Sequence, residues 1–137
     1  MLGNYISEWA AQFGIEADFH CRDGRLDDLA GEIRTAVYRI IQEALTNIAK
    51  HATGTTVVSI VINRADAVLQ LTIEDDGPGF DPGALRESGR GRLSGLGLAG
   101  MNERLTLIGG DLEIESSLST GTTIFARIPL GNERLIA

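Results

Sequence analysis

The segment 38–51 constrains the fold most, because it combines the core stripe of a helix with a functional polar face. Apolar side chains recur in and beside it at the three- and four-residue spacing of a buried helix face: Val37, Ile40, Ile41, Ala44, Leu45 and Ile48. Glu43 and Asn47 lie one turn apart on another face, and Lys50 and His51 follow within the next turn. The pattern predicts one helix that serves both the core and a polar site.

The residue types on this polar face suit a metal-bound phosphate chain. The Asn47 amide offers a neutral oxygen to a hard cation such as Mg²⁺, which takes its other ligands from phosphates and water. Glu43 can accept a proton from a nucleophile, and Lys50 can pair with a phosphate oxygen. The alternative interpretation is an ordinary amphipathic helix whose polar face is solvated.

Length, charge and cysteine content limit the class of protein. A chain of 137 residues is long enough for one domain with its own core. The net charge of −7 argues against nonspecific nucleic-acid binding, which needs a basic surface. The single cysteine excludes an intrachain disulfide and fits a reducing compartment. Without an apolar run of spanning length or a signal peptide, we expect a cytoplasmic chain that makes no direct membrane contact.

The other periodicities along the chain predict a two-layer α/β sandwich. Its mixed, mostly antiparallel sheet has about five strands, with helices on one face. We expect helices over 2–13, 26–52 and from Gly95 to about 108, an edge strand over 16–21, and hairpins formed by 56–63 with 68–75 and by 112–116 with 122–129. The long stretch between Asp75 and Gly95 is rich in Gly, Ser and Arg and is expected to be a functional loop.

Three glycine-containing motifs follow the long helix. Asp75-Asp-Gly77-Pro-Gly79 leaves a strand, where glycines let the backbone approach a planar ligand and a carboxylate can accept hydrogen bonds from an exocyclic amine. Gly95-Leu-Gly97 precedes a helix, whose first N–H groups and dipole favour an anion. Gly121-Thr122 lies in the last hairpin. Each motif taken alone is also compatible with a plain turn.

In their order along the chain, these motifs resemble the N, G1, G2 and G3 boxes of the GHKL (Bergerat-fold) ATPases. The amino-acid sequences of the segments 38–47, Lys50-His-Ala52 and 97–105 resemble those of one branch of that family. This branch is the NarX- and DesK-like sensor histidine kinases that work with NarL/LuxR-type response regulators. The resemblance extends from about Leu26 to Leu130.

The resemblance implies a role for each matching residue of the long helix and of the strand exit. Asn47 would bind the Mg²⁺ that bridges the phosphates of ATP, and Glu43 would act as general base or polarise the acceptor. Lys50 would contact phosphate, while His51 would lie against the ribose or the adenine edge. Asp75 would accept a hydrogen bond from the adenine amino group.

The same resemblance assigns the glycine motifs to the rim of the pocket. Gly77 and Gly79 would hinge a lid, and Thr122 would help to hold the adenine. At the start of the third helix, Gly95, Gly97 and Leu98 would close over the nucleotide. In the loop, Phe80 is a candidate wall of the base pocket, and Arg90 and Arg92 are candidate phosphate contacts or solvated charges.

The phosphoacceptor of such kinases has no counterpart here, because His20 falls in a predicted strand and His51 in the nucleotide pocket. We expect residues 1–25 to form a junction to an absent dimerisation and phosphoacceptor domain, and residues 26–137 to form the ATP-binding domain. The isolated chain is expected to be a monomer that does not autophosphorylate. Its expected partners are that domain and, downstream, a response regulator. Two alternatives are a stand-alone serine kinase of the anti-sigma type and a degenerate nucleotide-binding docking module.

Overall fold

The computed structural model of the chain describes residues 2–22, 29, 31–79 and 98–130. In chain order, its elements are α1 (Leu2–Phe13), β1 (Glu16–Arg22), α2 (Gly31–His51), β2 (Val57–Ala65), β3 (Val68–Asp75), α4 (Leu98–Leu107), β4 (Asp111–Ser116) and β5 (Thr122–Pro129). The strands form one sheet in the order β1-β2-β3-β5-β4. The pairing of β1 with β2 is parallel, and the other three pairings are antiparallel.

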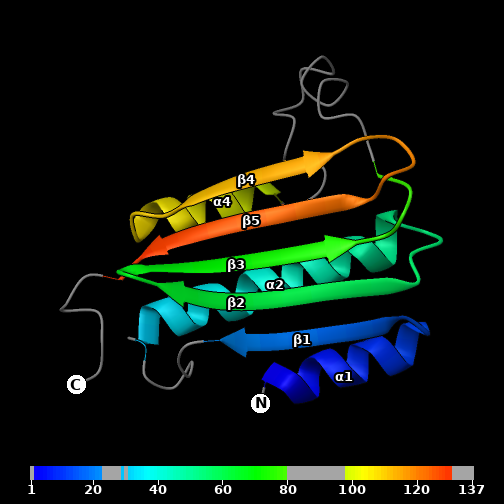
Figure 1. Cartoon of the computed structure of the whole chain (residues 1–137), viewed down its shortest axis with the longest axis horizontal. Coiled ribbons are helices and arrows are strands. Elements are labelled where there is room, and N and C mark those ends of the chain that lie inside the picture. The colour runs from blue at the N-terminus through cyan, green and yellow to red at the C-terminus, as the bar shows by residue number, and fades with distance from the viewer. Residues whose placement is uncertain (1, 23–28, 30, 80–97, 131–137) are drawn as a thin grey trace.

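The helices form a second layer on one face of this sheet (Figure 1). Helix α2 crosses behind β2 and β3, α4 lies behind β4 and β5, and α1 runs beside the edge strand β1. The predicted two-layer sandwich, with its mixed and mostly antiparallel sheet, is confirmed. Both predicted hairpins are present as β2–β3 and β4–β5.

The core lies between the two layers because alternate strand residues and one stripe of α2 are apolar. The stripe predicted from the sequence is buried along its whole length, from Val37 at 0% exposure to Ile48 at 6%. The sheet contributes the inward residues of its three central strands: Val58, Ile60, Ile62, Leu69, Leu71, Ile73, Ile124, Ala126 and Ile128. This packing leaves the other side of α2 available for polar residues.

The long helix begins later than the sequence pattern predicts. It starts at Gly31 rather than near Leu26, and Leu29 forms a β-bridge instead of helix. Leu29 is nevertheless only 1% exposed. Its burial explains the error, because a buried leucine at helical spacing from Ile33 extends the apolar pattern although its own backbone is extended. Residues 26–28 lie outside the described residues.

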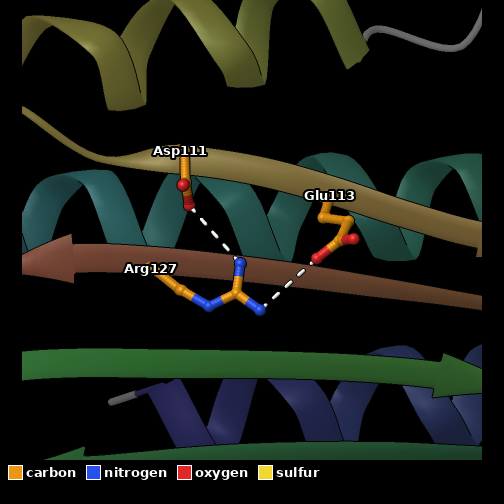
Figure 2. Close-up of polar contacts among 3 residues, drawn as sticks. All are labelled: Asp111, Glu113 and Arg127. Carbon is orange, nitrogen blue, oxygen red and sulfur yellow. Dashed lines mark hydrogen bonds and ion pairs between the residues drawn. The ribbon is translucent and has the colours of Figure 1, made fainter.

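The face of the sheet away from the helices carries polar side chains that cross-link its strands. Arg127 of β5 reaches Asp111 at 3.7 Å and Glu113 at 3.3 Å, both on the neighbouring strand β4 (Figure 2). All three side chains are substantially exposed, so these ion pairs contribute little to the free energy of unfolding. They do satisfy the Arg127 guanidinium within its own sheet.

Candidate functional site

The structure brings several of the predicted site residues to one end of the sheet. Asp75 is the last residue of β3, and Thr122, the first residue of β5, is its partner in the strand register. The last turn of α2 ends at the same place, since Ala52 lies beside Gly77 just beyond β3 (Figure 1). Residues far apart in sequence therefore meet at the C-terminal ends of α2 and β3.

Asp75 is a buried carboxylate at this meeting point, only 8% exposed. The backbone N–H of Gly77 donates to its Oδ1 at 2.9 Å, and backbone hydrogen bonding from Thr122 also stabilises the charged form. Burial outweighs these bonds and raises the pKa of Asp75 above its usual value. A buried carboxyl with remaining acceptor capacity fits a ligand that donates a hydrogen bond.

The adjacent Asp76 points to the other side of the strand end and is exposed. Its carboxylate accepts hydrogen bonds from the backbone N–H groups of Thr56 at 2.8 Å and Val57 at 3.0 Å, and from the Thr56 hydroxyl. The hydroxyl bond is the first cause that lowers the pKa of Asp76 to about 2, followed by the two backbone bonds. Asp76 therefore fastens the start of β2 to the end of β3.

The structural role of Asp76 was not predicted, although the sequence carries a signal for it. In a strand, neighbouring residues point to opposite faces, so two consecutive aspartates at a strand exit cannot share one task. Thr56, just before the neighbouring strand β2, supplies two of the donors for the outward carboxylate. Thr55 itself is buried, and its hydroxyl donates to the Ala52 carbonyl at 2.7 Å, closing the end of α2.

Glycines make the close contacts around Asp75 possible. A Cβ on Gly79 would overlap the Ser117 carbonyl oxygen, and one on Gly121 would overlap the carbonyl oxygen of Asp75. Both residues also have positive φ, +68° for Gly79 and +83° for Gly121. A Cβ on Gly77 would meet the Thr55 hydroxyl. Gly79 and Gly121 are required for the β4–β5 turn to pack onto the β3 exit, and Gly77 is required for that exit to pack against Thr55 and the end of α2.

The β4–β5 turn is also tied to this corner by hydrogen bonds. The N–H of Ser119 donates to the Pro78 carbonyl at 2.6 Å. The hydroxyls of Ser116 and Thr122 lie 2.9 Å apart, and the Ser116 hydroxyl donates to the Gly121 carbonyl at 3.0 Å. The hydroxyl of Thr122, a predicted adenine contact, is thus held beside Asp75 by a defined network.

The polar residues of α2 lie along its outer side. Glu43 is exposed and lines a cleft together with Arg104 of α4, while Asn47, one turn later, is half-buried. Lys50 is exposed and lines a different groove, of about 370 Å³, which it shares with Trp9 and Phe13 of α1. His51 is the last residue of α2. Glu43 and Lys50 therefore open onto two cavities rather than one.

Part of the predicted site lies outside the described residues, namely Gly95 and Gly97 together with Phe80, Arg90 and Arg92. Leu98 is the first residue of α4. Within the described ranges, no group of three or more His, Cys, Asp or Glu side chains is placed to hold a metal ion. No described helix is both long and apolar enough to cross a membrane.

Comparison with protein families gives a match to the model described as "Histidine kinase-, DNA gyrase B-, and HSP90-like ATPase" over residues 32–132. Two similar proteins are sensor histidine kinases. The oxygen sensor histidine kinase NreB of Staphylococcus carnosus is 35% identical over 130 residues, which are 93% of this chain and 35% of NreB. The sensor histidine kinase MctS of Rhizobium johnstonii is 36% identical over 126 residues, 92% of this chain and 26% of MctS.

Among solved structures, the histidine kinase domain of the blue-light activated kinase of Erythrobacter litoralis has the same fold. It superposes with a TM-score of 0.72 at 23% identity, over 96% of this chain and 60% of that one. At this identity the likeness shows the fold alone. The chain spans about a third or less of the length of the two sensor kinases that it matches.

Proposed function

Because this chain belongs to the histidine kinase-, DNA gyrase B- and HSP90-like ATPases, we propose that it binds Mg·ATP and donates the γ-phosphoryl group to a histidine on another domain. The sensor histidine kinases among its relatives support this choice over a serine kinase of the anti-sigma type. A phosphoryl transfer asks the protein mainly for positioning and for neutralisation of charge. The nucleophile arrives from outside, so the domain itself needs none.

The observation that carries the proposal is the buried carboxyl of Asp75. Gly77 and Gly121 pack so closely around Asp75 that a Cβ on either residue would crowd it. The Asp75 side chain faces the end of α2 rather than the solvent. We propose that Asp75 accepts a hydrogen bond from the adenine amino group, with Gly77 and Thr122 beside it. A raised pKa leaves Asp75 a better acceptor than an ordinary aspartate, because its charge is less well solvated.

The polar side of α2 fits the phosphate end of the same nucleotide. Asn47 is half-buried one turn from Glu43, and a single amide oxygen is enough for Mg²⁺, which takes its other ligands from phosphate and water. We propose that Asn47 holds the metal, which would neutralise charge on the phosphates. Glu43 would accept the proton or orient the incoming histidine, while Lys50 and His51 would contact the phosphates and the ribose.

The remaining assignments complete the proposed pocket. Gly95, Gly97 and Leu98 would close over the phosphates, and the Gly77–Gly79 segment would anchor the lid. Residues 1–25 would join this domain to the acceptor domain in a longer kinase, which would pass the phosphoryl group to a response regulator. Such a domain would work in the cytoplasm, where Mg·ATP is available.

The experiment that tests the proposal is titration of Asn47→Ala with Mg·ATP by calorimetry. We expect binding of Mg·ATP to be lost and the midpoint of thermal unfolding to be preserved, because Asn47 lies off the apolar stripe of α2. Asn63→Ala is the matched control, since Asn63 lies on β2 and on the open face of the sheet. A folded Asn47→Ala variant with the affinity of the unsubstituted chain would remove Asn47 from the site.

A further inference from the structure

A cleft of about 510 Å³ lies over the outer side of α2 and reaches α4. Arg39 and Glu43 line it from α2, Arg104 lines it from α4, and Tyr5 closes it on the side of α1. Three helices that are distant in sequence therefore contribute to one polar cleft. Of the predicted site residues whose side chains the structure describes, only Glu43 lines this cleft.

The cleft carries more positive than negative charge. Two guanidinium groups and one carboxylate line it, although the whole chain has a net charge of −7. Arg39 donates one long hydrogen bond, to Gln42 at 3.4 Å, and neither Arg39 nor Arg104 makes an ion pair within the described residues. Both side chains are exposed. The cleft thus presents two guanidinium groups that an anion can pair with.

Arg127 of the same molecule, in contrast, has its guanidinium paired with carboxylates. Its guanidinium lies between two carboxylates of β4 on the opposite face of the sheet (Figure 2). The difference matters because guanidinium groups bind carboxylates with directional, charge-assisted hydrogen bonds. An arginine pair without such partners, lining a polar cleft, points to an anion supplied by another molecule.

The position of Arg39 separates this anion from the nucleotide. Asn47 follows Arg39 by eight residues on the same helix, so the two lie about 12 Å apart along its axis. The cleft is lined by Arg39, Glu43 and Arg104 but not by Asn47, the proposed metal ligand. Glu43 stands midway between Arg39 and Asn47 along the helix. Arg39 therefore lies on the side of Glu43 away from the proposed metal, and an anion there is assigned to the molecule that approaches Glu43 from that side.

We propose that Arg39 and Arg104 bind a carboxylate side chain of the protein segment that carries the phosphate-accepting histidine. This inference rests on the proposed function, because it names how the acceptor is held at the same site. The two arginines are positioning residues: they set the acceptor segment over Glu43 without touching the reacting atoms. Acidic protein segments are the ligand class that such a cleft selects.

The test uses two fluorescent helical peptides and the whole chain, followed by fluorescence anisotropy. One alanine-rich peptide carries glutamates along one face, and the other carries lysines at the same positions. The net charge of −7 favours the lysine peptide everywhere except at a local cationic site. We expect the chain to prefer the glutamate peptide, and saturation with a non-hydrolysable Mg·ATP analogue to leave that preference unchanged.

The arginine variants locate the binding. We expect the double variant Arg39→Gln, Arg104→Gln to bind the glutamate peptide about tenfold more weakly, because two charge-assisted contacts are lost. Replacing both by lysine retains part of the affinity, because the charge remains and the bidentate geometry does not. Arg127→Gln is the control and leaves peptide binding unchanged, since its guanidinium is engaged on the other face. Unfolding midpoints of all variants are compared.

Preference for the lysine peptide, or full binding of the glutamate peptide by the double variant, would overturn the inference. So would competition by the nucleotide analogue, which would assign the arginines to the phosphates. The two proposals fail separately. A chain that binds the glutamate peptide through its arginines but never binds Mg·ATP contradicts the proposed function alone. One that binds Mg·ATP but not the peptide contradicts only this inference.

Discussion

The two consecutive aspartates at the exit of β3, Asp75 and Asp76, serve two different regions of the molecule. Asp75 is buried on the side of α2, and desolvation raises its pKa. Asp76 is exposed on the side of β2, and three hydrogen bonds from Thr56 and Val57 lower its pKa to about 2. The fold disfavours the charged form of Asp75, whereas the carboxylate of Asp76 joins the end of β3 to the start of β2.

This difference separates a binding group from a structural one without any knowledge of the ligand. A group that the fold stabilises in its charged form adds to the free energy of unfolding. A group that the fold keeps desolvated lowers that free energy, and groups of this kind cluster at functional sites. We propose from this contrast that Asp75 contacts the ligand and that Asp76 supports the scaffold, and each proposal has its own test.

The largest effect is expected from Gly79, which supports both aspartates by letting the β4–β5 turn reach the β3 exit. Gly79→Ala introduces a Cβ that overlaps the Ser117 carbonyl, in addition to the strain of a positive φ. We expect a loss of about 2–5 kcal/mol in the free energy of unfolding, measured by urea denaturation. Gly14→Ala is the matched control, because Gly14 has a similar φ of +66° and open space around it. Equal losses in the two variants would contradict the steric account of Gly79.

The second effect concerns the scaffold carboxylate. Asp76→Ala removes the acceptor for Thr56 and Val57, so we expect a lower midpoint of thermal unfolding. Below that midpoint, the variant is expected to bind Mg·ATP with unchanged affinity. Loss of nucleotide binding by a folded Asp76→Ala protein would show that the division between the two aspartates is wrong.

The third effect concerns the binding carboxylate. Asp75→Asn replaces a pure acceptor by a group that also donates, so the preference for ATP over GTP is expected to fall about tenfold. The free energy of unfolding at neutral pH is expected to change by less than about 1 kcal/mol, because the buried charge is removed. Competition titrations with ATP and GTP measure the preference. An undiminished preference for ATP would exclude Asp75 as the adenine contact.

The smallest effect is a pH dependence that distinguishes the pair. The folded pKa of Asp76, about 2, lies below its ordinary value of 3.8, so its contribution to stability is present above pH 4 and is lost as the pH falls toward 2. The raised pKa of Asp75 acts in the opposite sense, favouring the fold at low pH. Denaturation curves of Asp76→Asn are therefore expected to depend less on pH in this window than those of the unsubstituted chain.

The sequence predicted the parts of the fold that periodicity controls. The apolar stripe of α2 and the alternating apolar residues of β3 predicted which side chains form the core, and these side chains are buried in the structure. The start of α2 was misplaced because burial of Leu29 imitates a helical pattern. Periodicity reports which side chains are buried and cannot distinguish the backbone conformations that bury them.

The candidate site was only partly accessible to the same reasoning. The glycines after β3 were expected to favour a lid and a ligand, whereas their contacts also show a tightly packed corner with the β4–β5 turn. That contact joins segments more than 30 residues apart, and no local pattern encodes it. The role of Asp76 and the pairing of Arg39 with Arg104 in one cleft depend on tertiary structure in the same way.

The most direct test of the central claim is calorimetric titration of the purified chain with a non-hydrolysable ATP analogue, with and without Mg²⁺ and beside the corresponding GTP analogue. We predict binding that requires Mg²⁺ and strongly prefers adenine, because in the proposed function Asn47 and Asp75 hold opposite ends of one nucleotide. A folded chain that binds neither analogue at millimolar concentration, or binds both alike without Mg²⁺, would contradict this account.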